Sequence, residues 1–375
     1  MPGLRRSIAL AYDDVLLVPN PSFCKSTNDG EINFDYGLLP RPFSAPPLIN
    51  APMDTVCSPE LLQYLHDDLS MAVTVHRFFK SCDEQLQFIE DCEFEIGDVV
   101  GTACDYRKVF VSVGSLFKWK KWIDQLLGEG QERFPNISFL VDMANGGTLA
   151  CVETVKYIRK QSHYANIMAG NVSTPSQLYL LEEADVNFAR VGIGGGSICT
   201  TRKMTGFGYP TFASVMECAP AVNEDIYLVA DGGIEYPGDV CKSIAVGASM
   251  GMVGKVMAAT SLSAGIKLDR DFKVTNKPYN CHYIIYRGMA SKEVQAVLNP
   301  GNTVVSIEGV TGCIEYKGDT STVIPEFLHN LKASMTYYGG CRDWLEFQRK
   351  VECVEITNSG LRESEARVLL GKFQH

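Results

Sequence analysis

Short runs of apolar and β-branched residues recur along the chain, and each run ends in a polar or glycine-rich turn before a stretch with helical spacing. Eight such runs are found, at residues 46–52, 71–77, 109–114, 137–146, 166–172, 188–194, 226–233 and 248–254. Helix-like segments lie between them, as at residues 58–69, 148–161 and 175–184. Strands that alternate with helices in this way predict parallel βα units, and eight units close an α/β fold of the (β/α)8 TIM-barrel type.

The predicted strands end in polar or glycine clusters, among them residues 53–55, 142–147, 192–199 and 231–233. Active sites of TIM barrels form at the C-terminal ends of the strands, so these clusters are expected to meet at one mouth. A doubly wound open sheet made from the same βα units is the alternative architecture.

The chain loses this rhythm beyond the eighth unit. Residues 261–318 are predicted to form an active-site flap over the barrel mouth, because long irregular insertions in compact domains are usually lids or binding loops. Helix-like stretches follow at residues 325–339 and 341–351, and a charged tail occupies residues 360–373. We therefore predict one catalytic domain over residues 1–375, with the flap inside it.

Composition narrows the class of protein. The 375 residues are 46% hydrophobic and 21% charged, with a formal net charge of −10, which is typical of a globular enzyme and argues against a nucleic-acid-binding surface. No apolar run has transmembrane length, and the start lacks the apolar core of a secretory signal. The 13 cysteines are scattered without pairs, which indicates reduced thiols and a cytoplasmic location. The six histidines show no metal-ligand spacing.

The loop after the sixth predicted strand carries the most specific chemistry. It reads GIGGGSICTT, with three glycines at Gly194–Gly196 followed by Ser197 and Cys199. Glycine runs let backbone amides approach an anion, and Ser197 adds a hydroxyl donor. A cysteine on such a loop is placed as a nucleophile would be, although most glycine loops of this kind are only tight turns.

The order GSICTT followed by RKMTGFGYP resembles the active-site loop of the IMP dehydrogenase/GMP reductase family, and the resemblance extends from AYDDVLLVPNPS at residues 11–22 to the C-terminal tail. It implies that Cys199 attacks C2 of a purine nucleotide and forms a covalent adduct, which exchanges a hydride with a nicotinamide cofactor. It also implies that Glu308 moves protons together with Thr201.

The resemblance places a purine nucleoside monophosphate in the mouth. Asp231 is expected to hold the ribose hydroxyls, because a carboxylate offers two acceptor oxygens. The residues expected around the phosphate and the base are Ser197, Gly232, Gly233, Gly254, Lys255, Tyr286, Gly288 and Met289. Lys255 departs from the family, which usually has glycine or serine there, so its amide is expected to serve while the role of its ammonium stays open.

Further implications concern the cofactor, a cation and the assembly. Asp142, Asn145 and Arg77 are expected beside a nicotinamide cofactor, where the charge of Arg77 would suit the 2′-phosphate of NADPH, with NADH as the alternative. The backbone carbonyls of Gly194, Gly196 and Cys199 are the expected ligands of a potassium ion. The family resemblance implies a homotetramer.

Several features favour the reductase branch of the family. Residues 73–90 run from a strand into a helix without room for the paired regulatory domains of most dehydrogenases. Residues 292–307 lack the Arg-Tyr pair with which dehydrogenases activate water. Without this pair the chain lacks the base that dehydrogenases use to hydrolyse their adduct. VDMANG at residues 141–146 and TTRKMTGFGYP at residues 200–210 also resemble reductases.

Other features resemble dehydrogenases or depart from reductases. They are Arg287 in YRGM, Ala290, Val305 and the tail at residues 359–366, although Glu365 stands where the dehydrogenase tail has histidine. We weigh the missing base most and predict NADPH-dependent reductive deamination of GMP to IMP. The alternatives are an IMP dehydrogenase without regulatory domains, and a relative that binds purine nucleotides without catalysis.

Overall fold

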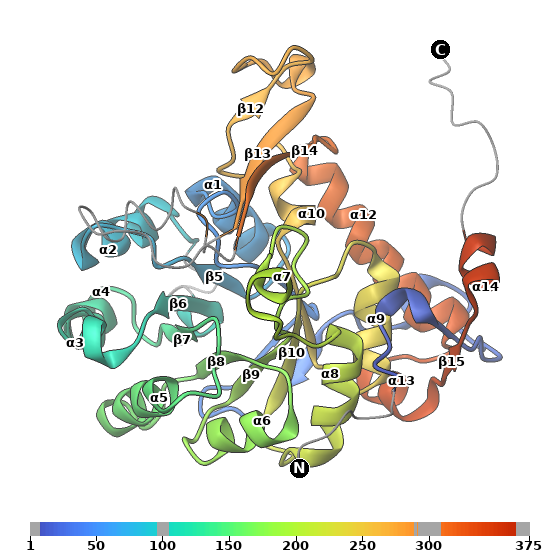
Figure 1. The fold of residues 1–375 in the computed structure, drawn as a ribbon, viewed down its shortest axis with the longest axis horizontal. Coiled ribbons are helices and arrows are strands. Elements are labelled where there is room, and N and C mark those ends of the chain that lie inside the picture. The colour runs from blue at the N-terminus through green and yellow to red at the C-terminus, as the bar shows by residue number, and fades with distance from the viewer. Residues whose placement is uncertain (1–7, 96–104, 289–290, 292–308, 365–375) are drawn as a thin grey trace.

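The computed structural model describes residues 8–95, 105–288, 291 and 309–364, and its centre is a sheet of eight parallel strands (Figure 1). The strands are β4 (Leu48–Asn50), β5 (Val73–Val75), β6 (Val109–Val113), β7 (Ser138–Asp142), β8 (Ile167–Val172), β9 (Phe188–Val191), β10 (Tyr227–Asp231) and β11 (Met250–Val253). Their order is β4-β11-β10-β9-β8-β7-β6-β5, and a parallel bridge between Ile49 and Ala72 brings the two ends together. The predicted TIM barrel is confirmed, and the open sheet is excluded.

The barrel strands form where the sequence has its continuous apolar runs. Every residue of β4, β5, β6, β9 and β11 is buried, as expected for parallel strands covered on both faces. The helices around the sheet are α1 (Pro59–Gln63), α2 (Cys82–Asp91), α3 (Leu116–Gln125), α5 (Leu149–Gln161), α6 (Pro175–Glu182), α8 (Thr211–Cys218), α9 (Pro237–Ala245) and α12 (Thr320–Ala333). β5 leads directly into α2, so no regulatory domain interrupts the barrel there.

Capping residues define where several helices begin. Ser58, Ser81, Thr148 and Thr174 precede α1, α2, α5 and α6, and each side-chain oxygen accepts a hydrogen bond from a backbone N–H three residues on. Each cap contributes about 1 kcal/mol. The helix expected from Pro325 begins earlier, at Thr320, because the side chain of Asp319 caps it.

An aromatic cluster closes one end of the barrel. The hairpin of β2 (Phe34–Tyr36) and β3 (Phe43–Ala45) supplies Tyr36, whose ring lies 5.5 Å from Phe188 of β9 and 5.0 Å from Tyr227 of β10. The Tyr36 hydroxyl donates to the carbonyl oxygen of Ser249, so the buried polar atom is satisfied. With its N-terminal end filled in this way, the barrel has its chemistry at the opposite end.

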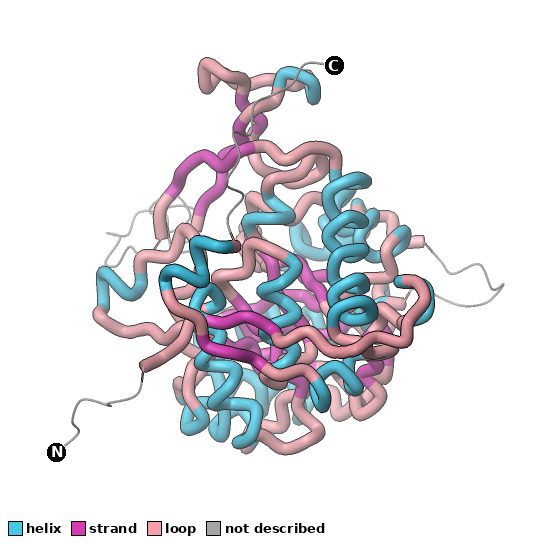
Figure 2. Tube along the Cα trace, turned by 90° about the vertical axis from the view of Figure 1, so that its right-hand side faces the viewer, coloured by secondary structure: helices cyan, strands magenta, loops and turns pink. Residues whose placement is uncertain are grey.

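The described segments of residues 261–318 include a three-stranded antiparallel sheet that projects from the body of the molecule (Figures 1 and 2). Its strands are β12 (Lys267–Leu268), β13 (Tyr283–Arg287) and β14 (Thr311–Glu315). At its base the N–H of Gly288 donates to the carbonyl oxygen of Val310, and Gly309 pairs with Cys199. The connection between β13 and β14 therefore starts and ends beside the Cys199 loop.

The remaining elements join the two ends of the chain. β1 (Val15–Leu17) pairs antiparallel with β15 (Cys353–Glu355), next to α13 (Trp344–Lys350) and α14 (Asn358–Glu363). The short helices α4 (Gln131–Arg133), α7 (Thr201–Thr205) and α10 (Lys255–Ala258) belong to connections between strands and helices. Among the residues that the structure describes, no helix is both long and apolar enough to cross a membrane.

Candidate active site

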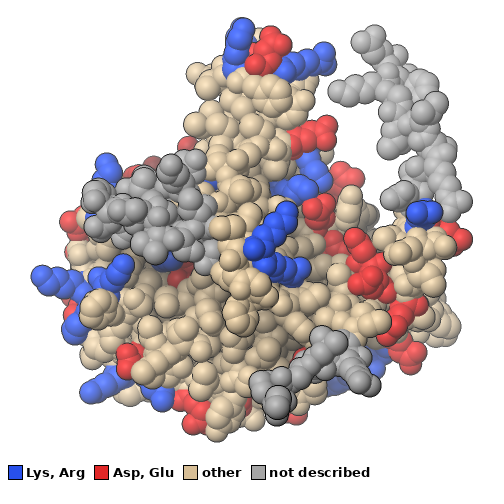
Figure 3. Space-filling model, viewed as in Figure 1, with Lys and Arg blue, Asp and Glu red and all other residues tan. Residues whose placement is uncertain are grey.

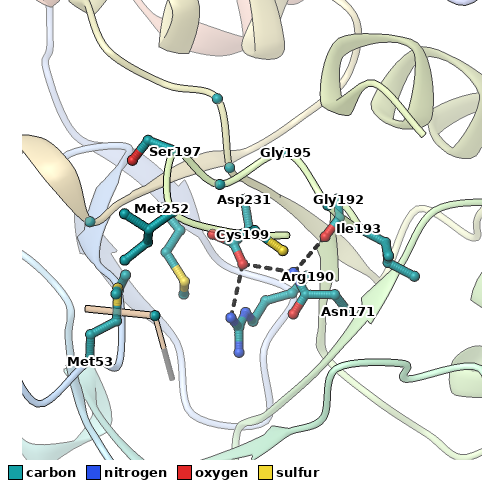
Figure 4. Close-up of a pocket in the computed structure, with 18 of the residues that line it drawn as sticks. Met53, Asn171, Arg190, Gly192, Ile193, Gly195, Ser197, Cys199, Asp231 and Met252 are labelled. Atoms are coloured by element: carbon teal, nitrogen blue, oxygen red, sulfur yellow. Dashed lines mark hydrogen bonds and ion pairs between the residues drawn. The ribbon is translucent and has the colours of Figure 1, made fainter. Parts of the chain in front are cut away.

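A cavity of about 370 Å³ opens at the C-terminal ends of the barrel strands (Figure 4). Most of the residues that the sequence singled out line it, namely Arg77, Asp142, Gly194, Gly196, Ser197, Cys199, Thr201, Asp231, Gly232, Gly233, Gly254, Lys255, Tyr286 and Gly288. Asn145 is not among the lining residues. Its amide oxygen accepts hydrogen bonds from the N–H of Gly147 and from Gln177. Met289 and Glu308 lie outside the described residues.

The Cys199 loop depends on glycines for its shape. Gly192 and Gly194 have φ values of 139° and 82°, which residues with a side chain rarely adopt. A Cβ at Gly192 would lie 2.0 Å from the carbonyl oxygen of Asp231, so only glycine lets the loops after β9 and β10 pack together. These glycines bring the nucleophile candidate and the carboxylate to one cavity.

Cys199 is half-buried at the cavity wall, and a hydroxyl lies next to its thiol. Its Sγ lies 3.1 Å from Oγ1 of Thr201, the first residue of α7, and its N–H donates to the carbonyl oxygen of Gly196. A thiol fixed beside a hydroxyl that can relay a proton is a suitable arrangement for nucleophilic attack on a planar ring.

A chain of alternating charges runs across the floor of the cavity. Arg190 of β9 donates to Oδ1 of Asp142 at 2.7 Å and to Oδ2 of Asp231 at 2.9 Å. Arg77 donates to Oδ2 of Asp142 at 3.0 Å, and Asn171 donates to Oδ2 of Asp231 at 2.7 Å. The side chain of Arg190 is only 8% exposed, so this guanidinium joins the two predicted carboxylates out of contact with solvent.

The pKa values of this network follow from burial and opposite charge. Burial would raise the pKa of Asp142, but the guanidinium groups of Arg190 and Arg77 hold it below its ordinary value. Burial would likewise lower the pKa of Arg190, yet the carboxylates of Asp231 and Asp142 raise it. Asp142 and Arg190 therefore keep their charges at neutral pH.

Sequence reasoning missed Arg190 as a site residue, and it placed Asn171 only in a polar cluster at the end of a predicted strand. Both lie inside apolar runs, FARV and IMAGNV, that indicate only a buried strand. A signal was nevertheless present, since an arginine within a buried strand requires an opposite charge.

The end of the cavity near Tyr286 and Ser197 is lined by hydroxyl groups and glycine turns. The ring of Tyr286 is buried, and a Cβ at Gly254 would lie 2.5 Å from its hydroxyl oxygen. Burial raises the pKa of Tyr286 well above its ordinary value and Asp231 adds to this, while a hydrogen bond with Ser197 opposes it. Tyr286 is therefore a protonated hydroxyl close to Ser197, and glycine turns at Gly232 and Gly233 complete a pocket that suits an anion.

Arg287, which the sequence marked as a departure from reductases, anchors the base of β13. Its Nε donates to Oδ2 of Asp54 at 2.9 Å, and Asp54 follows β4. The buried ring of His76 interacts electrostatically with both Asp54 and Arg287. It also stacks on Phe79, with 4.3 Å between ring centroids. The ion pair thus ties the start of the β13–β14 connection to the rim of the barrel.

His76 is expected to make the stability of the protein fall as the pH drops from about 6.5 to about 4. Burial lowers the pKa of His76 from 6.5 to about 4, so in this window the unfolded chain binds a proton that the folded chain does not. The expected loss of unfolding free energy is on the order of 3 kcal/mol. Urea unfolding measured across this pH range tests it. The same acid slope in a His76→Asn variant would contradict the assignment.

Comparison with known proteins gives one consistent family. A family model described as the IMP dehydrogenase / GMP reductase domain matches residues 9–367. The chain is 31% identical to GMP reductase 2 of Homo sapiens over 366 residues, which covers 95% of this chain and 97% of that protein. It is 31% identical to GMP reductase of Phytophthora infestans over 347 residues, which covers 91% of this chain and 89% of that protein. It is 38% identical to inosine-5'-monophosphate dehydrogenase of Rhizobium tropici over 231 residues, which covers 60% of this chain and 46% of that protein.

Proposed function

The chain belongs to the IMP dehydrogenase/GMP reductase family, and we propose that it is a GMP reductase, which converts GMP to IMP and ammonia. The proteins it resembles are oxidoreductases, and the chain is an enzyme of that class. The extent of the match carries the choice of reductase. Similarity runs through 97% of a reductase of matching length, but through only 46% of a dehydrogenase. The missing Arg-Tyr pair in residues 292–307 supports the same choice.

The proposed chemistry has two covalent steps at purine C2. The thiolate of Cys199 forms a bond to C2 of GMP, and the C2–N bond breaks as ammonia leaves with a proton that Glu308 supplies through Thr201. When bound, a reduced nicotinamide would supply the hydride for C2, and the breaking of the C–S bond would then free Cys199 and IMP. Atoms and electrons balance, because GMP and the hydride donor yield IMP, ammonia and the oxidised cofactor with a proton from solvent.

The ribose and the cofactor have candidate partners among the described residues. Both hydrogen bonds that the Asp231 carboxylate accepts there fall on Oδ2, which leaves Oδ1 for a ribose hydroxyl. Arg77 uses Nε for Asp142, so its terminal nitrogens are available to an anionic cofactor. NADPH is proposed on that basis, with NADH as the alternative. Asn145 would act through the loop after β7, since the cavity lining does not include it.

IMP dehydrogenase activity is the second candidate, and Arg287 favours it. This arginine matches dehydrogenases and donates hydrogen bonds to Asp54 at the base of β13. Without the Arg-Tyr pair, however, the chain would need another base to activate water for hydrolysis of the adduct.

A substrate screen tests the proposal. The purified protein is mixed with GMP, IMP or XMP and with NADPH, NADH, NADP or NAD, and the absorbance of the reduced nicotinamide and the release of ammonia are followed together. Loss of NADPH with GMP, matched by ammonia, is the expected result. Reduction of NAD with IMP and formation of XMP would establish the dehydrogenase instead. Nucleotide binding by calorimetry without turnover of any pair would identify a non-catalytic relative.

We also propose a cytoplasmic homotetramer with a potassium site. α14 lies at the edge of the molecule, where it is open to a neighbouring copy (Figure 1). The potassium ligands would be carbonyls of Gly194, Gly196 and Cys199, of which the Gly196 oxygen also accepts from the Cys199 N–H and keeps a second lone pair. Light scattering at micromolar concentration and turnover with potassium replaced by lithium test these two points.

A further inference from the structure

An ion pair bridges two turns at the donor-rich end of the cavity. Nζ of Lys255 lies 2.8 Å from Oε1 of Glu235, and both residues line the cavity. Lys255 follows Gly254 at the start of α10, while Glu235 comes just after the turn at Gly232 and Gly233. The pair therefore sits beside the same donors, Ser197 and Tyr286, that suit a phosphate.

The ion pair contributes little to the stability of the fold, so Lys255 can exchange Glu235 for another anion. The side chains of Lys255 and Glu235 are 35% and 44% exposed, and ion pairs this exposed contribute little to stability. A phosphate dianion offers Lys255 more negative charge and three acceptor oxygens in place of one carboxylate. An entering phosphate can thus take the ammonium from Glu235 at small cost.

Space exists for the displaced carboxylate. Glu235 also lines a second cavity of about 240 Å³ on the far side of the glycine turns, together with Gly195, Gly232 and Gly233. Arg202 of α7 lines that second cavity, and Lys and Arg side chains gather over α7 on the face shown in Figure 3. Glu235 can therefore turn away from the anion into this cavity, where Arg202 offers a cation alongside the carboxylates of Asp13 and Asp239.

We propose that Lys255 is a specificity residue for the 5′-phosphate, which its ammonium binds on release from Glu235, and that Glu235 weakens binding by competing for that ammonium. The inference rests on the proposed function in one respect, since it takes the ligand to be a purine nucleoside 5′-monophosphate. It predicts that the two residues act in opposite directions on nucleotide affinity and leave the affinity for the nucleoside unchanged.

The test compares Lys255→Ala, Lys255→Arg and Glu235→Gln with the wild type. Calorimetry measures binding of GMP, guanosine, IMP and inosine, and steady-state kinetics separate KM from kcat. Lys255→Ala is expected to weaken the binding of GMP and IMP by about 10-fold to 100-fold, because one charge-assisted hydrogen bond disappears. The change should appear as a higher KM with an unchanged kcat. Lys255→Arg should recover most of the affinity, and Glu235→Gln should increase the affinity for both nucleotides.

The control is Lys118→Ala, which removes the same charge from the exposed surface of α3. Equal weakening of nucleotide and nucleoside in Lys255→Ala, or equal effects of Lys255→Ala and Lys118→Ala, would overturn the inference. Unchanged nucleotide affinities in Glu235→Gln would show that Glu235 does not compete with the phosphate for the Lys255 ammonium. A wild type that binds IMP and GMP but does not turn GMP over would refute the reductase alone, since the affinity ratios would still test Lys255.

Discussion

Replacement of Cys199 with alanine is expected to abolish turnover and to leave nucleotide binding close to that of the wild type. In the proposed mechanism the thiol forms the only covalent bond to the substrate, so its loss should lower kcat by roughly 10⁴-fold or more. The phosphate and ribose partners belong to other elements, such as Tyr286 on β13 and Asp231 on β10, and do not need the thiol. Single-turnover kinetics and calorimetry with GMP measure the two effects separately.

A second cysteine variant controls for general effects of thiol removal. Cys24→Ala removes a half-buried thiol near the carbonyl oxygen of Cys341, away from the cavity lining, and turnover should be unaffected. Residual turnover in Cys199→Ala within about 10-fold of the wild type would exclude covalent catalysis by this residue. Equal loss of GMP affinity and of kcat would instead assign Cys199 to binding.

The barrel could be predicted from sequence because its signals are local. Each strand is a short apolar run that must be buried on both faces, and glycine or aspartate marks its end, so all eight predicted strands are found. The hairpin of β2 and β3 was not predicted. Its strands have three residues each, and their stability comes from packing of Tyr36 and Phe43 against barrel residues far along the chain.

The site could be predicted in part for the same reason. The glycine-rich Cys199 loop and the turn after Asp231 are local patterns with a family likeness. Partnerships between distant positions carry no local signal: Arg190 meets Asp142 and Asp231 across 48 and 41 positions, and Arg287 meets Asp54 across 233. Because these partners are chosen by the closure of the barrel, only the structure identifies the network and the pairing of Lys255 with Glu235.

The charge network also predicts the largest effect on stability, in an Arg190→Gln variant. Arg190 lies between two carboxylates that are 15% and 17% exposed, and glutamine would leave both without their shared cation. Breaking a buried pair from one side typically costs about 3 to 5 kcal/mol, because the remaining charge stays desolvated after it loses its counter-ion. Asp142 would keep Arg77, whereas Asp231 would keep only the neutral amide of Asn171. Urea unfolding at neutral pH should show a lower midpoint with an unchanged slope.

A double-mutant cycle separates charge from shape. Since Asp142→Asn removes one of the stranded carboxylates, the Arg190→Gln/Asp142→Asn double variant should lose less stability than the two single variants combined, by about 1 to 3 kcal/mol. Arg190→Lys should fall between wild type and Arg190→Gln, since it keeps the charge but cannot donate to both carboxylates with a planar fork. Additive losses, or an Arg190→Gln variant within about 1 kcal/mol of the wild type, would show that Asp142 and Asp231 are held by their other partners, Arg77 and Asn171.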